Sequence, residues 1–384
     1  MNKWYLIPSL ISVPSSFAST YFAINGIELL HLSNSFVAIS IILFNILSFL
    51  SSIVGSKIEN SGHNREIFLL SSLMCLIPII IALLYKSEIT YLTAITTIAF
   101  FSTLASIALS FSILENMDED EAIFALKVTK LAGGVSGSLA SMFAGLIASF
   151  PITMLSIMFA IIFFSFNIPK GILNYRSFIL FNNFLKRADR ASFYALFSSP
   201  LVSIEGLSRI SSGKRVFGFI LANRFLFATS SGLFFSVIPP FLLRTSSSDI
   251  TYIALGLNSL SSSLGYLLAR RVSAKAMNLA IILRSFVILS VPFLWTQSYL
   301  LGTIALMVMG IMWSIYDNSI TYYSASNAPQ GLYAIFSGVF DIGEILGALI
   351  GGFLILNTYI SIIISFSFLL ASFITGLIIS KLLI

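Results

Sequence analysis

Apolar stretches of about 20 residues recur along the whole chain and are separated by shorter polar segments. A helix of this length crosses the hydrocarbon core of a bilayer, which is roughly 30 Å thick. Strands of a membrane barrel would be about 10 residues long, with alternating apolar and polar positions. We therefore predict membrane-spanning helices at 4–27, 34–55, 66–86, 90–113, 131–149, 152–168, 216–243, 250–268, 277–295, 299–321, 332–356 and 359–380.

The composition indicates the same class of protein. Hydrophobic residues make up 57% of the 384 residues, and charged residues make up only 9%. A soluble domain has about a quarter charged residues, so this chain lacks the polar groups that would cover a surface in water. We predict an all-α integral membrane protein whose main surroundings are the lipid bilayer.

Basic residues are distributed unequally between the loops at the two ends of these helices. The loops at one end contain most of the lysines and arginines, and those at the other contain only Lys86 and Arg244. Loops rich in lysine and arginine stay in the cytoplasm. We expect a multi-pass protein of the plasma membrane with both termini in the cytoplasm, as an even number of helices requires.

The segment 169–215 is the one long polar stretch, and it is rich in lysine and arginine. It divides the chain into a six-helix bundle at 1–168, a basic cytoplasmic linker and a second six-helix bundle at 216–384. Phenylalanines and leucines alternate with its basic residues, so it is either a plain linker or an amphipathic helix on an anionic inner leaflet. The membrane explains the positive charge, and we expect no nucleic-acid partner.

A shift of about 210 residues aligns the two halves. Gly55, after the second predicted helix, then corresponds to Gly265 after the eighth. Gly137 of the fifth helix lies beside Gly347 of the eleventh. Helix order and loop lengths agree with the same shift. Two parallel halves of six helices are the architecture of many secondary transporters.

The loop between the second and third predicted helices reads Gly55-Ser-Lys-Ile-Glu59-Asn-Ser-Gly62-His-Asn-Arg65. It resembles the pattern Gly-x-x-x-Asp-x-x-Gly-x-(Arg/Lys)-(Arg/Lys) of the major facilitator superfamily, with Glu59 as the acid and Arg65 as one base. The resemblance implies a transporter of two pseudo-symmetric six-helix bundles. It also implies a gating role for this loop, in which the acid approaches the N-terminal end of the eleventh helix and holds the halves together. The alternative for Glu59 is a solvated loop carboxylate.

Charged residues well inside the predicted helices, away from their ends, lie in the second half only: Arg224, Arg284, Asp317, Asp341 and Glu344. Each costs roughly 2.5–3.5 kcal/mol on insertion scales, so each needs a partner or a function. Asp341 and Glu344 share one helix face near the middle of the bilayer. Since two such carboxylates repel each other, one can keep a proton near neutral pH, which indicates proton coupling. The alternative is a static network in which Arg224 pairs with one of them.

Trp313 and Tyr316 precede Asp317 in the tenth predicted helix. By the family resemblance, the first, fourth, seventh and tenth helices line a central cavity. Trp313, Tyr316 and Asp317, with Arg224 of the seventh helix, are then candidate contacts of a small-molecule substrate. Asp317 is alternatively an interfacial acid that pairs with an arginine of the preceding loop. Arg284 lies in a helix that is peripheral in the family, and we interpret it as structural, with its side chain reaching toward the cytoplasm.

Small residues recur at every fourth position of two predicted helices: Gly133, Gly137, Ser141 and Gly145 in the fifth, and Gly343, Gly347 and Gly351 in the eleventh. Such stripes let helix backbones approach closely. They indicate either surfaces along which the two halves move or ordinary helix packing.

These features predict a secondary transporter that moves a small solute by alternating access, with protons as the coupling ion, as a monomer and without a cofactor. The alternative is a scramblase, a scaffold or a lipid-modifying enzyme. We expect no enzyme, because the sequence contains no nucleophile motif and no histidine–acid pairing. His31 and His63 lie in different predicted loops, and Cys75 is the single cysteine, so no metal-ligand spacing occurs.

Overall fold

The computed structural model describes residues 4–30, 34–58, 63–117, 119–147, 150–169, 215–268, 273–327, 335–354 and 357–382. In these residues the chain forms twelve α-helices, one short 3-10 helix (η1) and one π-helical turn (η4). The elements are η1 Pro8–Ile11, α1 Ser12–Leu30, α2 Asn34–Ile58, α3 Asn64–Leu84, α4 Glu88–Asn116, α5 Glu119–Leu146, α6 Phe150–Ser165, α10 Arg215–Thr245, α11 Ser248–Leu268, α12 Ala274–Gln297, α13 Tyr299–Asn327, α14 Ile335–Leu349, η4 Ile350–Leu354 and α15 Thr358–Leu382.

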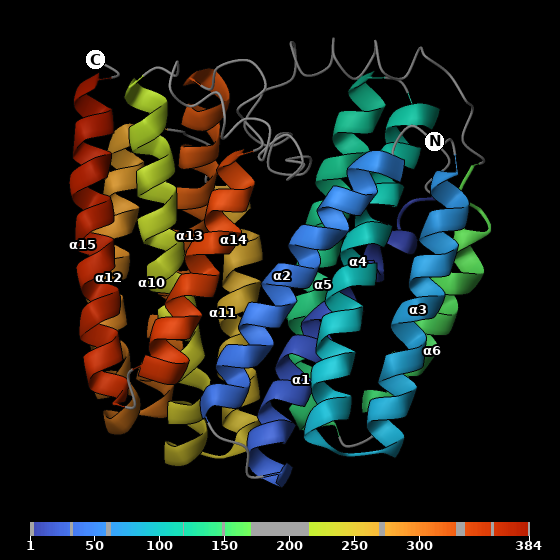
Figure 1. Ribbon diagram of the computed structural model, residues 1–384, viewed down its shortest axis with the longest axis horizontal. Helices are drawn as coiled ribbons and strands as arrows, with labels where there is room; N and C mark the ends of the chain where they lie inside the picture. The colour runs from blue at the N-terminus through green and yellow to red at the C-terminus, as the bar shows by residue number, and fades with distance from the viewer. Residues whose placement is uncertain are drawn as a thin grey trace.

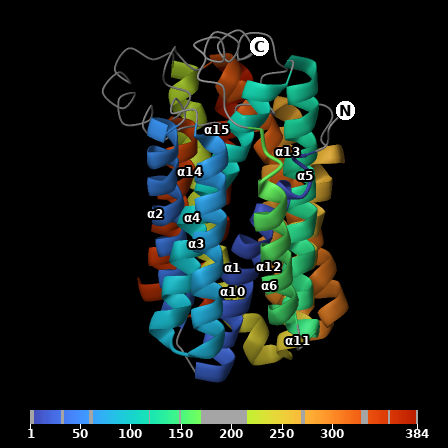
Figure 2. The ribbon, with the colours of Figure 1, turned by 90° about the vertical axis from the view of Figure 1, so that its right-hand side faces the viewer.

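The helices form two bundles of six, α1 to α6 and α10 to α15, which lie side by side (Figure 1). All of them run between the same two ends of the molecule, as the side view shows (Figure 2). Within the bundles the main contacts join α3 with α4, α10 with α14 and α15, and α13 with α11 and α12. Between them, α5 packs against α11, and α2 packs against α14 and α10. The predicted all-α membrane fold with two six-helix bundles is confirmed.

Each bundle has its own hydrophobic core. The first core is built from α1 to α6 and receives one buried residue from the other bundle, Tyr252 of α11. The second core consists of residues between Phe217 and Ile379. The exact boundaries of the basic linker, and its possible surface helix, concern residues 170–214, which lie outside the described part of the chain.

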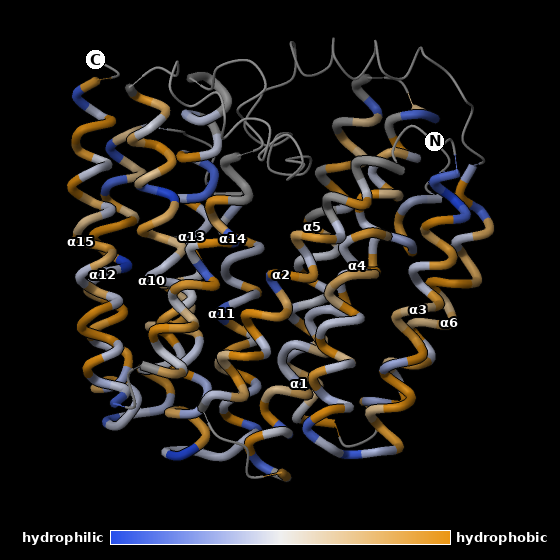
Figure 3. The backbone as a smooth tube through the Cα atoms, viewed as in Figure 1, coloured by the Kyte–Doolittle hydropathy of each residue, from blue (hydrophilic) through white to orange (hydrophobic). Residues whose placement is uncertain are grey.

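Hydrophobic residues predominate along the outer helices (Figure 3). These helices expose large apolar side chains, as expected where lipid replaces water. Phe159 and Phe163 of α6 are 59% and 69% exposed, and Phe286 and Phe293 of α12 are 59% and 66% exposed. Six of the described helices are long and apolar enough to span a membrane by themselves: α3, α4, α10, α12, α13 and α15. The helices that join the bundles, α2 with α14 and α5 with α11, are outside this set and contact protein over much of their length.

Several helices extend beyond the apolar stretch from which they were predicted. Helix α5 begins at Glu119 rather than at 131, and α13 continues to Asn327 rather than ending at 321. Backbone hydrogen bonding continues past the hydrocarbon core, where charged residues are allowed. The predicted helix 332–356 is divided, since α14 ends at Leu349 and η4 follows with its two glycines.

The small residues of α14 pack mostly within their own bundle. The Cα atoms of Gly343, Gly347 and Gly351 lie against the backbone or side chains of α10. In α5, Gly133 and Gly137 lie against α1, whereas Gly145 meets Tyr252 of α11. Close helix packing therefore explains most of both stripes, and only part of the α5 stripe faces the other bundle.

Direct contacts between the bundles include three side-chain hydrogen bonds. Ser138 Oγ of α5 donates to Ser259 Oγ of α11 at 2.9 Å. The Tyr252 hydroxyl donates to the carbonyl oxygen of Tyr21 at 3.4 Å, and Ser35 Oγ donates to that of Gly352 at 3.4 Å. Ser35, Tyr252 and Gly352 lie next to the α1–α2, α10–α11 and α14–α15 connections. These connections are at the end of the molecule opposite both chain ends (Figure 1), so the bundles touch at that end.

The α10–α14 contact can be tested with one methyl group. A Cβ atom at position 347 would overlap the carbonyl oxygen of Thr229 and lie 2.6 Å from the backbone nitrogen of Leu233. Because backbone atoms cannot rotate away, we expect Gly347→Ala to lower the free energy of unfolding by about 1–3 kcal/mol. Gly218→Ala in α10 is the matched control, since nothing lies within 4 Å of its added Cβ. Thermal unfolding of both purified variants checks this, and equal melting temperatures would contradict the close packing.

Candidate functional site

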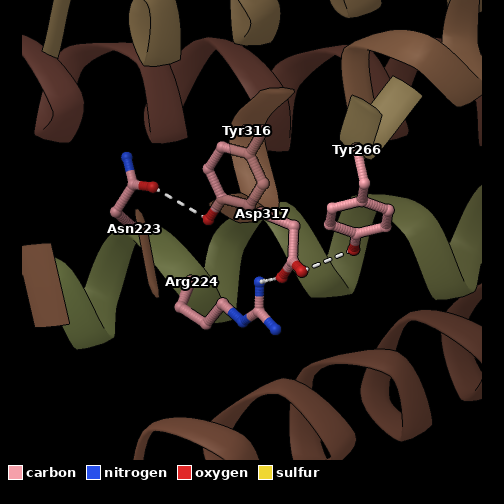
Figure 4. A network of polar contacts seen from close by, with 5 residues as sticks. All are labelled: Asn223, Arg224, Tyr266, Tyr316 and Asp317. Carbon is pink, nitrogen blue, oxygen red and sulfur yellow. Dashed lines mark hydrogen bonds and ion pairs between the residues drawn. The ribbon is translucent and has the colours of Figure 1, made fainter. Parts of the chain in front are cut away.

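The charged residues of the second bundle centre on an ion pair between α10 and α13. The Nη1 atom of Arg224 donates to Oδ1 of Asp317 at 2.5 Å, and both side chains are buried (Figure 4). The hydroxyl of Tyr266, on α11, donates to Oδ2 of the same carboxylate at 2.6 Å. Asp317 therefore binds groups from two neighbouring helices. This combination of a charge partner and further hydrogen bonds is what a buried carboxylate needs.

The pairing answers one question that the sequence left open. Arg224 pairs with Asp317 of α13, and among the described residues it forms no ion pair with Asp341 or Glu344 of α14. Asp317 is 6% exposed and lies inside the bundle. The arginines of the preceding loop, at 270–271, lie outside the described residues.

A second polar network, one residue earlier on each helix, ties α10 and α13 to α15. The Tyr316 hydroxyl donates to Oδ1 of Asn223 at 3.0 Å (Figure 4). Nδ2 of Asn223 donates to the carbonyl oxygen of Ser372 at 2.6 Å and to Oγ1 of Thr375 at 3.0 Å. Tyr316 also stacks on Phe227, with ring centroids 3.6 Å apart. The candidate substrate residue Tyr316 thus has its hydroxyl and its ring engaged by protein groups.

Trp313 lies between two buried arginines. The guanidinium carbon of Arg224 is 5.8 Å from the centroid of its ring, and that of Arg284 is 5.6 Å away. Arg224 also lies over Phe340 of α14 at 4.4 Å, and Arg284 over Phe227 of α10 at 4.9 Å. Aromatic faces attract cations, and the attraction is stronger where water is excluded. These rings therefore help to hold two positive charges in the interior.

Asp341 and Glu344 of α14 are partly buried acids. In the part of the chain that the structure describes, neither forms an ion pair. Glu344 and Asn45 of α2 border the same cavity, across the boundary between the bundles. Glu344 also borders a second cavity together with Arg284 of α12. The predicted closeness of the two acids on one helix face is thus accompanied by a cavity shared with the other bundle.

Two cavities meet at Glu344. The first, of about 330 Å³, lies between the bundles and is lined by Ser19, Thr20, Ala23, Ile24, Val37, Ser40, Ile41, Phe44, Asn45, Ile95, Gly232, Phe235, Pro239, Leu255, Asn258 and Glu344. The second, of about 180 Å³, lies in the second bundle and is lined by Ser231, Phe235, Asn258, Ser259, Ser262, Arg284, Gly310, Trp313 and Glu344. Two of the residues predicted to bind substrate or protons line these cavities: Glu344 lines both, and Trp313 lines the second. The other candidates, Arg224, Tyr316, Asp317 and Asp341, are not among the lining residues of either.

Arg284 corrects one interpretation of the sequence. Its helix, α12, is peripheral and exposes apolar residues, but the side chain does not reach toward the cytoplasm. Arg284 is 2% exposed and turns inward, where Nη1 donates to the carbonyl oxygen of Met309 and Nη2 to Ser231 Oγ, both at 3.1 Å. The interior of the bundle supplies these polar partners and the aromatic faces of Phe227 and Trp313. The sequence signal was present, because an arginine at the eighth residue of the predicted helix 277–295 lies too deep to be idle.

The gating loop is only partly described. Glu59 and Gly62 lie outside the described residues. Gly55 is buried in α2 and packs against Ile107 of α4, and Arg65 lies in the first turn of α3.

Next to Arg65, Nδ2 of Asn64 donates to Oε1 of Glu115 at 2.9 Å. Burial raises the pKa of the Glu115 carboxyl, and the hydrogen bond from Asn64 offsets part of the rise. Glu115, which the sequence did not single out, therefore belongs to this end of the first bundle.

No protein-family profile and no curated protein sequence matches the chain. Solved structures do resemble it over nearly its whole length. A bacterial homologue of the human lysosomal transporter Spinster, in an inward-facing and unoccupied conformation, has a TM-score of 0.71 and 13% identity, covering 98% of this chain and 96% of its own. The nucleoside transporter NupG has a TM-score of 0.69 and 11% identity, covering 99% of this chain and 100% of its own.

A third similar structure is the proton:xylose symporter XylE, described as a major facilitator superfamily protein. It has a TM-score of 0.63 and 10% identity, and the match covers 97% of this chain and 94% of the symporter. At these identities the likeness establishes the fold. The chain therefore has the fold of the major facilitator superfamily, as the loop pattern after the second helix predicted.

The Arg224–Asp317 pair should make a large contribution to stability. Removing one partner of a buried pair costs about 3–5 kcal/mol, so we expect Asp317→Asn to destabilise the protein by that amount. Tyr266→Phe, which removes one hydrogen bond, should cost about 1 kcal/mol. The double variant Arg224→Gln with Asp317→Asn should be more stable than Asp317→Asn alone. Unfolding of these three variants and of Arg224→Gln alone in detergent measures this. A double variant as unstable as the sum of Arg224→Gln and Asp317→Asn would argue against the pair.

Proposed function

We propose that this chain is a secondary transporter that carries a small solute across a membrane by alternating access and couples the movement to protons. The central observation is that Glu344, an acid that forms no ion pair among the described residues, borders a cavity between the two bundles. Membrane transport also agrees with the similar structures, which are transporters of nucleosides and sugars and a transporter homologue.

The cavity between the bundles has the position that alternating access requires. Its lining comes from α1, α2 and α4 of the first bundle and from α10, α11 and α14 of the second. A solute bound there contacts both bundles, so movement of one bundle against the other can change the side from which the solute is reached. A volume of about 330 Å³ is at the lower end of small-molecule sites.

Glu344 is suited to link protonation to that movement. When ionised, its carboxylate can accept a charge-assisted hydrogen bond from the amide of Asn45 on the other bundle. When protonated, it loses the charge and with it the stronger form of this contact. Proton binding then weakens one connection between α2 and α14. Asp341, one turn earlier, is the second acid through which the same coupling can act.

The other candidates have supporting roles in this proposal. Trp313 borders the second cavity and offers an aromatic face to the solute. The Arg224–Asp317 pair and Tyr316 hold α10 and α13 in position behind it. The loop with Gly55, Glu59, Gly62 and Arg65 gates the end of the molecule opposite the contacts of Ser35, Tyr252 and Gly352. In the alternative state the bundles come together at that end.

The membrane orientation follows from the charge of the loops. With both termini in the cytoplasm, the contacts of Ser35, Tyr252 and Gly352 lie on the outer side, and the present arrangement is inward-facing. The bundles 1–168 and 216–384 then move as two units joined by the basic linker 169–215 in the plasma membrane. The protein acts as a monomer without a cofactor, because the cavity is complete within one chain.

Proton coupling can be tested with the purified protein in liposomes. Labelled xylose, a nucleoside and benzoate are offered with an imposed pH gradient, acidic outside. We expect one solute to accumulate by up to about tenfold per pH unit, for one proton per solute, and a protonophore to abolish the accumulation. Asp341→Asn combined with Glu344→Gln should remove the dependence on the gradient. Unchanged pH dependence in that double variant would rule out coupling through these acids.

Alternating access can be tested with two matched cysteine pairs in a Cys75→Ala background. Ser138 and Ser259 join α5 to α11 across the bundles, with Oγ atoms 2.9 Å apart. Ser230 and Ser365 join α10 to α15 within one bundle, with Oγ atoms 2.7 Å apart. We expect oxidation of the first pair to stop transport and reduction to restore it, because the bundles must separate there. The second pair should have little effect, and active transport with the first pair fully oxidised would contradict the movement.

A further inference from the structure

Arg284 is a buried cation whose charge is not neutralised by a bonded acid. It forms no ion pair in the described residues, and it is 2% exposed. Its guanidinium has five N–H groups, and the two hydrogen bonds it makes go to neutral acceptors, the carbonyl oxygen of Met309 and Ser231 Oγ. Its Nε has no acceptor within the described part of the chain. A charge placed so deep normally has a counter-charge, so an anion is expected beside it.

The space for this anion exists. Arg284 lines the second cavity, of about 180 Å³, together with hydroxyl groups of Ser259 and Ser262. Asn258 lines it too, and the Nδ2 atom of its amide is a hydrogen-bond donor. Hydroxyl and amide groups around a guanidinium are the donors that bind carboxylates and other oxyanions. The site therefore offers hydroxyl and amide donors around a guanidinium that forms no ion pair among the described residues, and Glu344 lines the same cavity.

The second cavity adjoins the first. Phe235, Asn258 and Glu344 line both. A solute whose body lies in the mostly apolar space between the bundles can therefore extend one end toward Arg284. We propose that Arg284 binds the anionic group of the transported solute, so that the substrate is a small organic acid. This inference rests on the proposed transport function, because it assigns the solute to the same pair of cavities.

The charges around Glu344 determine when an anion can bind. Arg224 of α10 faces it but pairs with Asp317 of α13, and Asp341 lies on its own helix. From α2 the facing group is the neutral amide of Asn45, and Arg284 of α12 is the remaining cation. An ionised Glu344 would repel an anion that shares its cavity, whereas a protonated Glu344 would not. The organic acid and one proton therefore bind together.

The test uses three probes of nearly equal shape and different charge: benzoate, benzamide and benzamidinium. Binding to the purified full-length protein in detergent is measured by thermal shift and by calorimetry, and acetate and inorganic phosphate extend the size range. We expect at least one anion to bind, benzamide to bind more weakly and benzamidinium not to bind. Arg284→Gln should weaken anion binding by at least about tenfold, the effect of losing a hydrogen bond to a charged group. Arg244→Gln, which removes an exposed arginine at the end of α10, should leave it unchanged.

One variant is expected to bind anions more tightly, a result that a misfolded protein cannot give. Glu344→Gln removes the repelling carboxylate, so we expect anion affinity near pH 8 to rise several-fold and to lose its dependence on pH. In the unmodified protein, affinity should rise as the pH falls from 8 to 6. The inference is overturned if none of the three anions binds, if Arg284→Gln binds them as well as the unmodified protein, or if Glu344→Gln gains no affinity.

Binding without a membrane separates this inference from the transport proposal. If anions bind through Arg284 but never cross the membrane of a liposome, the result would support the binding site and contradict the proposed transport function. Proton-driven uptake of xylose or a nucleoside, with no anion binding, would support transport and remove the organic-acid substrate.

Discussion

The cost of placing charge where water cannot reach it determines the arrangement of the second bundle. Five charged side chains lie well inside its predicted membrane helices: Arg224, Arg284, Asp317, Asp341 and Glu344. The fold accommodates them in different ways. Arg224 and Asp317 neutralise each other, with Tyr266 completing the carboxylate's hydrogen bonds. Arg284 uses a carbonyl, a hydroxyl and two aromatic faces. The ion pair fixes α10, α11 and α13 relative to one another, and the cavities are shaped by these same helices.

Two chemical roles are thereby separated on neighbouring helices. The paired charges of α10 and α13 are satisfied by protein groups and stabilise the bundle. Glu344 of α14 and Arg284 of α12 form no ion pair among the described residues, and both border the second cavity. Because neither residue has an ion-pair partner there, Glu344 can bind a proton and Arg284 can bind an anion in the same cavity. This is the physical basis on which we assign coupling to Glu344 and solute binding to Arg284.

The interface between the bundles has a different chemistry from their interiors. The two cores are dominated by large apolar side chains, while the α5–α11 contact uses serine hydroxyls and close glycine approaches. Tyr252 of α11 and Met142 of α5 also lie against glycines of the opposite helix, so the bundles are closely packed along this contact. The glycines of α14, in contrast, face α10 in their own bundle, where close packing keeps the two helices together. The stripe of α14 therefore keeps this helix packed on α10, whereas part of the α5 stripe lies at the interface between the bundles.

The sequence by itself determined the fold class, the number of helices, the two halves and the unequal distribution of buried charge. The number and length of the helices follow from hydropathy and the thickness of a bilayer. The two halves follow from the internal repeat. Its errors concern helix ends and side-chain direction, as with the start of α5 and the inward turn of Arg284. Only the tertiary structure decided that Arg224 pairs with Asp317 and that Glu344 borders both cavities. The physical reason is that a helix apolar on all sides contains little information about its rotation, which packing against its neighbours sets.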